Sequence, residues 1–180
     1  MGYAGGKKLN PTYHDLGDHT EAFQIDYDPA VISYEKLLSL FWNNRASCRA
    51  AWSRQYMSAI FYHNDEQKKL ALETKKAVAA TGKEVHAEIL PVGTFTLAED
   101  YHQKYMLRND RVLMREFKAM YPNDADFVNS TAAARVNGYL GGGRRKITEA
   151  ELRSLGLSPD GEKYLRKQVE VVEPAAAVAE

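Results

Sequence analysis

The stretch Met1-Gly-Tyr-Ala-Gly-Gly6 opens the chain with a tyrosine inside a glycine-rich turn. Because glycine has no Cβ, the backbone of such a turn can pass close to a ligand. The run Gly17-Asp-His-Thr-Glu21 then leads into residues 20–27, whose alternation of polar and apolar side chains predicts a half-buried strand. Turn and strand together predict a site that contains Tyr3 and Glu21.

Composition limits what this site can serve. The chain has 180 residues, of which 44% are hydrophobic and 27% are charged, as expected for one compact globular domain. Its formal net charge is zero, so no long-range field draws it to nucleic acid or to an acidic membrane. No apolar run approaches the roughly 18 residues of a membrane span, and the glycine-rich start is unlike a secretory signal.

Histidine and cysteine usage predicts neither a metal site nor a disulfide framework. The five histidines lack the spacings that are typical of zinc sites, and Cys48 is the single cysteine. One cysteine fits a reducing compartment, so we expect a cytoplasmic protein.

The order of the predicted elements favours a two-layer α+β fold. The predicted strands are residues 20–27, 55–62 and 85–90. The predicted helices are residues 33–44, residues 64–80, a segment opened by the capping box Thr96-Leu-Ala-Glu99, residues 111–121 and residues 124–136 ended by Gly138. A hinge at Gly141-Gly-Gly143, short helices from Thr148 and Ser158, and a frayed tail over residues 169–180 are expected to follow.

Glu21 is the strongest candidate for chemistry. A carboxylate on the apolar face of a strand, beside Phe23 and Ile25, is poorly solvated, which favours its protonated form and lets it act as a general acid. The alternative is a strand-end glutamate that pairs with a basic residue. Tyr3 and Tyr56 are candidate hydrogen-bond donors, although most of the 11 tyrosines must serve in packing.

Weaker candidates lie elsewhere along the chain. His102 and His19 are isolated histidines, which are more often structural than catalytic. Cys48 is flanked by arginines that would favour a thiolate, but no nearby residue reads as its base, so we expect no catalytic role. The basic run Gly143-Arg-Arg-Lys146 lacks interleaved aromatic residues and is more simply a solvated hinge.

In order and spacing, several segments resemble the A-type peptide methionine sulfoxide reductases of a eukaryotic-type branch. The matching segments are Gly2-Tyr-Ala-Gly-Gly6, Asn10-Pro-Thr-Tyr13, His19-Thr-Glu21, Tyr27-Asp-Pro29, Gln55-Tyr56 with Ser58-Ala-Ile60, and Ala98-Glu-Asp-Tyr-His-Gln103. The resemblance implies a ferredoxin-like reductase domain over residues 1–142, in which residues 108–142 form a helical extension. The hinge, short helices and tail then occupy residues 143–180.

This family reduces the S epimer of methionine sulfoxide, free or in proteins, and so repairs oxidised proteins. A thiolate attacks the sulfoxide sulfur, a second thiol resolves the sulfenic acid, and thioredoxin or another dithiol is the reductant, with no bound cofactor. The resemblance implies the following roles: Glu21 as the general acid, Tyr3 and Tyr56 as hydroxyls that bind the sulfoxide oxygen, and His102, Asp100 and His19 as substrate-binding residues.

The sequence also departs from the family. The family's nucleophile lies in a Gly-Cys-Phe-Trp motif whose aromatic residues wall the substrate methyl group, and these 180 residues hold no such motif. Ala51 stands where common bacterial members have an aspartate, and no resolving cysteine follows Gly143.

We therefore expect that the sequence lacks its N-terminal catalytic segment, and with it the domain's first strand and helix, which would leave a sheet edge unpaired. Two alternatives remain: a catalytically inactive short form that binds oxidised methionine, and a reductase that uses Cys48 as its nucleophile. A targeting segment upstream of Met1 would direct the protein to an organelle instead of the cytoplasm.

Overall fold

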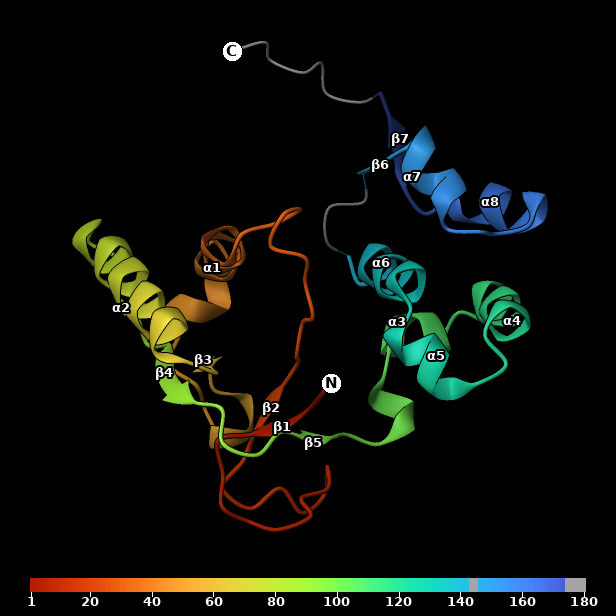
Figure 1. Cartoon of the computed structure of the whole chain (residues 1–180). Helices are drawn as coiled ribbons and strands as arrows, with labels where there is room; N and C mark the ends of the chain where they lie inside the picture. Colours follow the sequence, from red (N-terminus) through yellow and green to blue (C-terminus); the bar gives the residue numbers. More distant parts are fainter. Residues whose placement is uncertain (143–145, 174–180) are drawn as a thin grey trace. The chain divides into compact units, whose positions relative to one another are not determined.

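The computed structural model describes residues 1–142 and 146–173 of the chain. Short strands and helices alternate through these residues, which confirms the predicted α+β class. The chain divides into two compact units, Met1–Glu99 and Asp100–Glu180 (Figure 1). Within the described part of the chain, no helix combines the length and the apolar character needed to cross a membrane.

The first unit contains two small sheets. Strands β1 (Gly2–Ala4), β2 (Thr20–Ala22) and β5 (Thr96–Leu97) form an antiparallel sheet in the order β2-β1-β5. Strands β3 (Ala59–Tyr62) and β4 (Glu88–Pro91) pair in parallel. The glycine turn therefore supplies the central strand of the first sheet, and all three residues of β1 are buried.

Two helices cover the parallel pair. Helix α1 (Tyr34–Trp42) begins at Ser33, and helix α2 (Asp65–Ala80) begins at Asn64; in both, the capping side chain accepts a backbone N–H, as the sequence predicts. Their apolar faces share a core with the two strands, made of Leu38, Trp42, Ile60, Ala71 and Ala87.

The boundaries of the three strands predicted for this unit differ from those in the structure. β2 ends at Ala22, so Phe23 and Ile25 are exposed. The strand predicted over 55–62 starts only at Ala59, because residues Arg54–Tyr56 form a 3-10 turn (η2) in which the Tyr56 amide donates to the Ser53 carbonyl. The strand predicted over 85–90 is displaced to Glu88–Pro91.

The predicted capping box at Thr96-Leu-Ala-Glu99 does not open a helix. Thr96 and Leu97 form β5, and the Glu99 carboxylate accepts hydrogen bonds from Tyr3 and from Tyr13 instead of capping a local amide. Glu99 therefore bonds residues that are distant in the sequence, Tyr3 and Tyr13, and not a backbone amide of its own segment.

The second unit is mainly helical. Its elements are η3 (Asp100–His102), α3 (Tyr105–Arg108), α4 (Arg111–Met120), α5 (Asp124–Asn129), α6 (Thr131–Leu140), β6 (Lys146–Thr148), α7 (Glu149–Ser154), α8 (Pro159–Leu165) and β7 (Glu170–Val172). Strands β6 and β7 pair in parallel. The predicted starts of α7 at Thr148 and of α8 at Ser158 are confirmed by their caps.

The boundaries inside this unit differ from those predicted. The helix predicted over 124–136 is two helices, because Ser130 is extended and its Oγ accepts from the Ala133 amide to start α6. Gly138 lies inside α6, and residues 170–172 of the predicted frayed tail form β7.

The domain boundary predicted at residue 142 lies inside the second unit, because residues on both sides of it fill one core. Its fully buried side chains include Leu107, Phe117, Ile147 and Leu165. The hinge predicted at Gly141-Gly-Gly143 and the basic run from Gly143 to Lys146 fall partly on residues 143–145, and the end of the predicted tail falls on 174–180. Both stretches lie outside the described residues.

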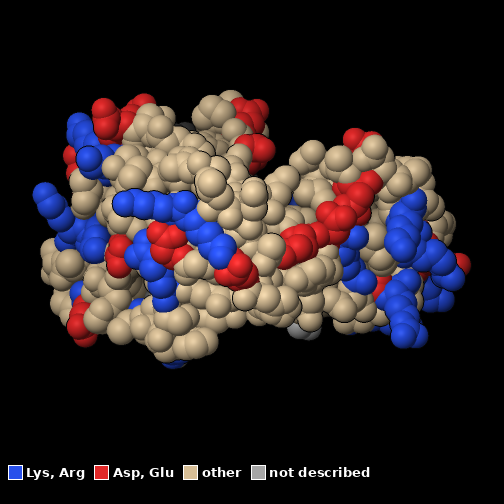
Figure 2. Space-filling view, turned by 90° about the horizontal axis from the view of Figure 1, so that it is seen from below, with Lys and Arg blue, Asp and Glu red and all other residues tan. Residues whose placement is uncertain are grey.

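Charged side chains of both signs are present on the face that Figure 2 shows, and neither sign covers the whole of it. This distribution agrees with the zero formal net charge of the sequence. It gives no reason to expect a long-range attraction for a polyanion.

Candidate active site

Glu21 stands in β2, directly across from Tyr3 in β1. Its carboxylate oxygen Oε1 accepts a hydrogen bond of 2.7 Å from the Gln55 amide Nε2. Gln55 belongs to η2, which β2 holds in place, because the Thr20 hydroxyl donates to the Arg54 carbonyl at 3.0 Å. The half-buried acid is therefore fixed on one side by an amide donor.

Tyr56, the next residue in η2, brings a hydroxyl group to the same place. The Gln55 amide Nε2 lies 3.2 Å from the Tyr56 hydroxyl, which in turn lies 3.3 Å from the hydroxyl of Tyr13. The hydrogen bond with Tyr13, then loss of hydration, then the nearby charge of Glu21 raise the pKa of Tyr56 to about 12. The Tyr56 hydroxyl is therefore neutral at physiological pH, as in an ordinary tyrosine, with a wider margin before it ionises.

Tyr3 lies where the sequence predicts it, but its hydroxyl is directed elsewhere. The side chain is only 1% exposed, and its hydroxyl donates to Glu99 Oε2 at 2.6 Å. The other oxygen, Glu99 Oε1, accepts from the Tyr13 amide at 3.1 Å. Tyr3 and Glu99 thus anchor the backbone of Tyr13, whereas Tyr13 itself presents a hydroxyl beside Tyr56.

Tyr13 is the site residue that the sequence reasoning missed. It ends the segment Asn10-Pro-Thr-Tyr13, yet the family resemblance implies Tyr3 and Tyr56 as the oxygen-binding residues. The available signal was its position in that segment. Nothing local distinguishes it from other tyrosines, because the hydrogen bond to Tyr56 joins residues 43 positions apart.

His19 has a structural role that differs from the predicted substrate contact. The ring is buried; its Nδ1 accepts from the Gly6 amide at 3.3 Å, so Nε2 carries the proton and donates to the Lys8 carbonyl at 2.9 Å. A Cβ on Gly6 would lie 2.5 Å from the His19 ring, which explains the glycine. Both ring nitrogens therefore hold the loop that follows β1.

The neighbouring residue Asp18 strengthens the same loop. Its carboxylate accepts from the amides of Lys7 at 2.8 Å and Lys8 at 3.1 Å, and these two hydrogen bonds hold the pKa of Asp18 below its usual range. Within the segment from Gly17 to Glu21, Asp18 and His19 therefore hold the loop that follows β1, whereas Glu21 contacts Gln55 at the candidate site.

Asp100 and His102 belong to η3, at the start of the second unit. The His102 ring lies 4.2 Å from that of Tyr101, centroid to centroid. Their predicted contact with substrate stays a prediction. Among the described residues, no group of three or more His, Cys, Asp or Glu side chains is arranged to hold a metal ion.

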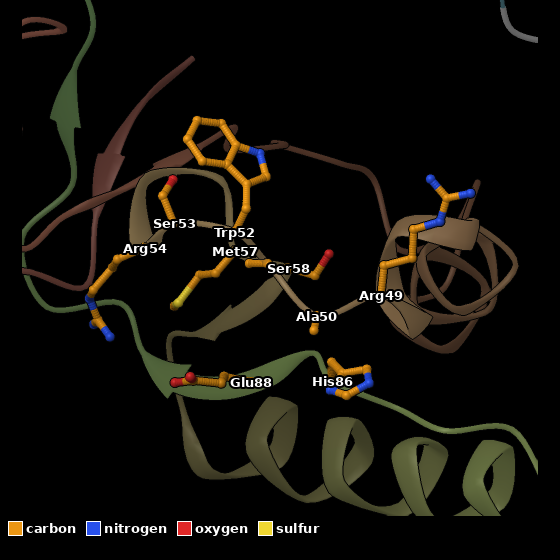
Figure 3. Close-up of a pocket in the computed structure, with 10 residues that line it drawn as sticks. Arg49, Ala50, Trp52, Ser53, Arg54, Met57, Ser58, His86 and Glu88 are labelled. Atoms are coloured by element: carbon orange, nitrogen blue, oxygen red, sulfur yellow. The ribbon is translucent and has the colours of Figure 1, made fainter.

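A pocket of about 340 Å³ lies next to η2. Figure 3 shows Met57 and Ser58 on one side of it and His86 and Glu88 on the other. Trp52, at the rim, is 82% exposed, and its ring centroid lies 5.0 Å from that of Tyr56. Glu21, Tyr13 and Tyr56 do not line this pocket, and the ring contact of Trp52 with Tyr56 is what connects the two places.

Cys48 does not line this pocket. It ends the 3-10 turn η1 (Arg45–Cys48) and is half-buried, with its Sγ 3.7 Å from the Ser47 hydroxyl. The structure therefore gives no support to a thiol nucleophile at this position.

The role of Tyr13 can be tested by titration. Tyr13→Phe removes the hydrogen bond with the Tyr13 hydroxyl, which is the largest cause of the raised Tyr56 pKa. We therefore expect the pKa of Tyr56 to fall from about 12 toward the ordinary tyrosine value near 10. The pKa of Tyr56 is higher in the folded chain than in the unfolded chain. The contact with Tyr13 therefore stabilises the fold at pH values below the unfolded pKa of about 10, and this stabilisation is lost as the pH rises from about 10 to about 12. NMR titration of tyrosine Cζ carbons measures the shift.

Tyr3→Phe is the matched control for that titration. It removes the hydroxyl that donates to Glu99, so it should lower the free energy of unfolding by about 1–3 kcal/mol while shifting the Tyr56 pKa less than Tyr13→Phe does. An unchanged Tyr56 titration in Tyr13→Phe would contradict the assignment of Tyr13.

These side chains define a class of site. A carboxyl group and two phenol hydroxyls lie together on a small α+β unit, and hydroxyl donors suit an oxygen atom that carries partial negative charge. A family model described as peptide methionine sulfoxide reductase matches residues 1–136. The chain belongs to the peptide methionine sulfoxide reductase family.

Individual relatives agree with this assignment. A peptide methionine sulfoxide reductase of Drosophila melanogaster is 39% identical over 94% of this chain and 70% of its own length. The peptide methionine sulfoxide reductase A5 of Arabidopsis thaliana is 36% identical over 77% of this chain, which spans only 56% of that relative. The crystal structure of reduced Mxr1 from Saccharomyces cerevisiae is similar with a TM-score of 0.55 at 28% identity, over 61% of this chain and 70% of that one.

Proposed function

We propose that this chain serves the reduction of methionine-S-sulfoxide, in proteins or free, with Glu21 as the general acid and Tyr13 and Tyr56 as the hydroxyls that bind the sulfoxide oxygen. The observation that carries the proposal is the continuous set of hydrogen bonds from Glu21 through Gln55 and Tyr56 to Tyr13. Tyr13 here takes the place that the sequence reasoning gave to Tyr3.

The chemistry of the reaction fits these groups. A thiolate attacks the sulfoxide sulfur while the oxygen takes up protons and leaves as water; overall, two thiols and a sulfoxide become a disulfide, a thioether and water. Gln55 donates both to Glu21 Oε1 and toward the Tyr56 hydroxyl, so the Glu21 carboxyl group is held beside the phenol, where a general acid would act on the leaving oxygen. The Tyr56 phenol, whose pKa is raised to about 12, is protonated at neutral pH as any tyrosine is, and its hydroxyl can stabilise the developing charge.

The pocket beside Trp52 supports a peptide substrate. It provides about 340 Å³ next to η2, and its lining includes the polar side chains Arg54, Ser58 and Glu88 and the apolar Met57. An exposed indole at its rim offers an apolar surface for the thioether part of the substrate.

The reaction needs an attacking thiol, and its source decides whether the chain itself provides the nucleophile. Cys48 is the single cysteine of the sequence and does not line the pocket. We propose that the attacking thiol comes from outside these 180 residues, and that a dithiol of the thioredoxin type, in a reducing compartment such as the cytoplasm, supplies the reducing equivalents. No bound cofactor takes part in this scheme.

Binding and turnover should be measured together. Calorimetry with a peptide that contains methionine-S-sulfoxide, matched against its R epimer and its thioether, tests the oxygen site; turnover is then followed with dithiothreitol and with thioredoxin. We expect binding that prefers the S epimer. Absence of any preference for the sulfoxide over the thioether would overturn the proposal.

Cys48→Ser distinguishes the routes. Turnover that survives this change supports an external thiol, and turnover that disappears assigns the nucleophile to Cys48. Binding without turnover in either protein identifies the alternative function, a module that binds oxidised methionine.

A further inference from the structure

Gln55 lies between the two groups that the proposed function uses as acid and oxygen-binding phenol. Its side-chain nitrogen Nε2 lies 2.7 Å from Glu21 Oε1 and 3.2 Å from the Tyr56 hydroxyl. A primary amide carries two N–H groups on one nitrogen, so it can direct one of them to each acceptor. A single nitrogen atom therefore contacts both the carboxyl group and the phenol.

The 3-10 turn η2 gives the Gln55 side chain a fixed base. The Thr20 hydroxyl donates to the Arg54 carbonyl at 3.0 Å. The Arg54 side chain donates through Nε to the Asp18 carbonyl at 2.8 Å, and through Nη2 to the Gly5 carbonyl at 3.3 Å. The residue before Gln55 is thus held from both its backbone and its side chain. A side chain on such a base can hold its neighbours to the narrow geometry that a reacting site requires.

The charge of Glu21 determines which end of the Gln55 amide faces it. Carboxylate oxygens accept hydrogen bonds, so they attract the N–H end of an amide and repel its carbonyl end. The same N–H end also faces the Tyr56 oxygen, which then acts as an acceptor at this contact. The single proton of the Tyr56 hydroxyl is therefore directed away from Gln55.

The Gln55 amide competes with Tyr56 for the Glu21 carboxylate. The hydrogen bond with Tyr13, loss of hydration and then the charge of Glu21 raise the pKa of Tyr56 to about 12, so the phenol lies within the influence of that carboxylate. A phenol whose proton is donated to a carboxylate cannot donate it to a substrate oxygen. By supplying Glu21 with another donor, Gln55 leaves the Tyr56 proton available.

We propose that Gln55 is a positioning residue for the reduction of methionine sulfoxide: its amide occupies the Glu21 carboxylate, so that the Tyr56 hydroxyl is directed to the sulfoxide oxygen. This inference rests on the proposed function, in which Glu21 and Tyr56 serve one oxygen atom of the substrate. Gln55 acts through these two neighbours and does not touch the reacting atoms.

Gln55→Met tests the role of the amide in binding, because it nearly keeps the length of the side chain and removes both N–H groups. We expect the preference for a peptide with methionine-S-sulfoxide over the matching thioether peptide to fall by about tenfold, since the Tyr56 hydroxyl then donates to Glu21. Affinity for the thioether peptide should not change, because a thioether sulfur is only a weak acceptor. Calorimetry with the two peptides measures both affinities.

Titration of Tyr56 tests the same role without any ligand. In Tyr13→Phe the pKa of Tyr56 is expected to fall from about 12, which brings it into a measurable range. Adding Gln55→Met should raise that pKa again, because the phenol oxygen loses an N–H donor and the hydroxyl gains Glu21 as its acceptor. A change that only loosened η2 would expose the phenol to water and would not raise the pKa. NMR titration of tyrosine Cζ carbons measures the shift.

Gln67→Met is the matched control. Gln67 is a half-buried glutamine of the same unit, in the first turn of α2, and its Oε1 accepts from the His63 amide at 2.9 Å. This change should alter neither the preference for the sulfoxide peptide nor the titration of Tyr56. Circular dichroism spectra that match the unmodified chain show that both glutamine variants keep the fold.

The outcomes separate this inference from the proposed function. If the unmodified chain does not prefer the sulfoxide peptide, the proposed function fails and the role of Gln55 in it fails as well. If the unmodified chain has this preference and Gln55→Met keeps it in full, the role of Gln55 is overturned while the proposed function stands. A Tyr56 pKa that stays the same or falls when Gln55→Met is added to Tyr13→Phe would also overturn the role of Gln55.

Discussion

Glu21→Gln is expected to lower kcat/KM for methionine-S-sulfoxide reduction by at least about 100-fold, because an amide cannot donate the proton that the leaving oxygen needs. The substitution keeps the geometry, since the new carbonyl oxygen can still accept from Gln55 Nε2. Initial rates with a sulfoxide peptide and a dithiol reductant measure the effect.

Glu66→Gln is the control for that variant, because Glu66 is an exposed residue in the first turn of α2. Its kinetics should match those of the unmodified chain. If turnover is absent from the unmodified chain, affinity for the sulfoxide peptide becomes the readout, and Glu21→Gln should weaken binding more than Glu66→Gln does. Equal effects of the two changes would remove Glu21 from the site.

Phe117→Ala is expected to lower the free energy of unfolding of the second unit by about 3–5 kcal/mol. The Phe117 ring is fully buried, and it lies 6.1 Å from the ring of Tyr121 and 6.2 Å from that of Phe127. Truncation leaves a cavity at the centre of a core that helices before and after residue 142 share. Urea unfolding followed by circular dichroism measures the change.

Tyr105→Ala provides the comparison, because Tyr105 is an exposed aromatic residue of the same unit. Its loss should change the free energy of unfolding by less than about 1 kcal/mol. A small effect of Phe117→Ala, similar to that of Tyr105→Ala, would mean that the second unit does not depend on this core.

Local signals predicted much of the helical structure. Ser33, Thr148 and Ser158 each cap the helix that the sequence predicts at that point, and Asn64 caps the helix whose start the sequence leaves open between Asn64 and Asp65. Each of these caps depends on a side chain and an amide three residues away, so the information needed lies within one turn of helix. The same reasoning fails at Ser130, where a second helix starts inside an apparently continuous helical pattern.

The candidate site was only partly visible in the sequence. Glu21 and Tyr56 lie together, as the family resemblance implies, although the residue that joins them is Gln55. His19 was expected at the substrate, but the backbone of the glycine turn uses both of its ring nitrogens. A buried histidine and a ligand-binding histidine have the same sequence pattern; only the surrounding backbone distinguishes them.

The segment Met1-Gly-Tyr-Ala-Gly-Gly6 shows which features of this protein can be predicted from its sequence and which cannot. By itself the sequence determined the family, the class of fold and most of the helix starts, because these depend on ordered motifs and on caps of a few residues. The tertiary structure alone decided that Tyr3 is buried against Glu99, 96 positions away, and that Tyr13 takes the place beside Tyr56. A phenol bonds whichever acceptor the fold brings within reach, and that choice is made across the whole unit.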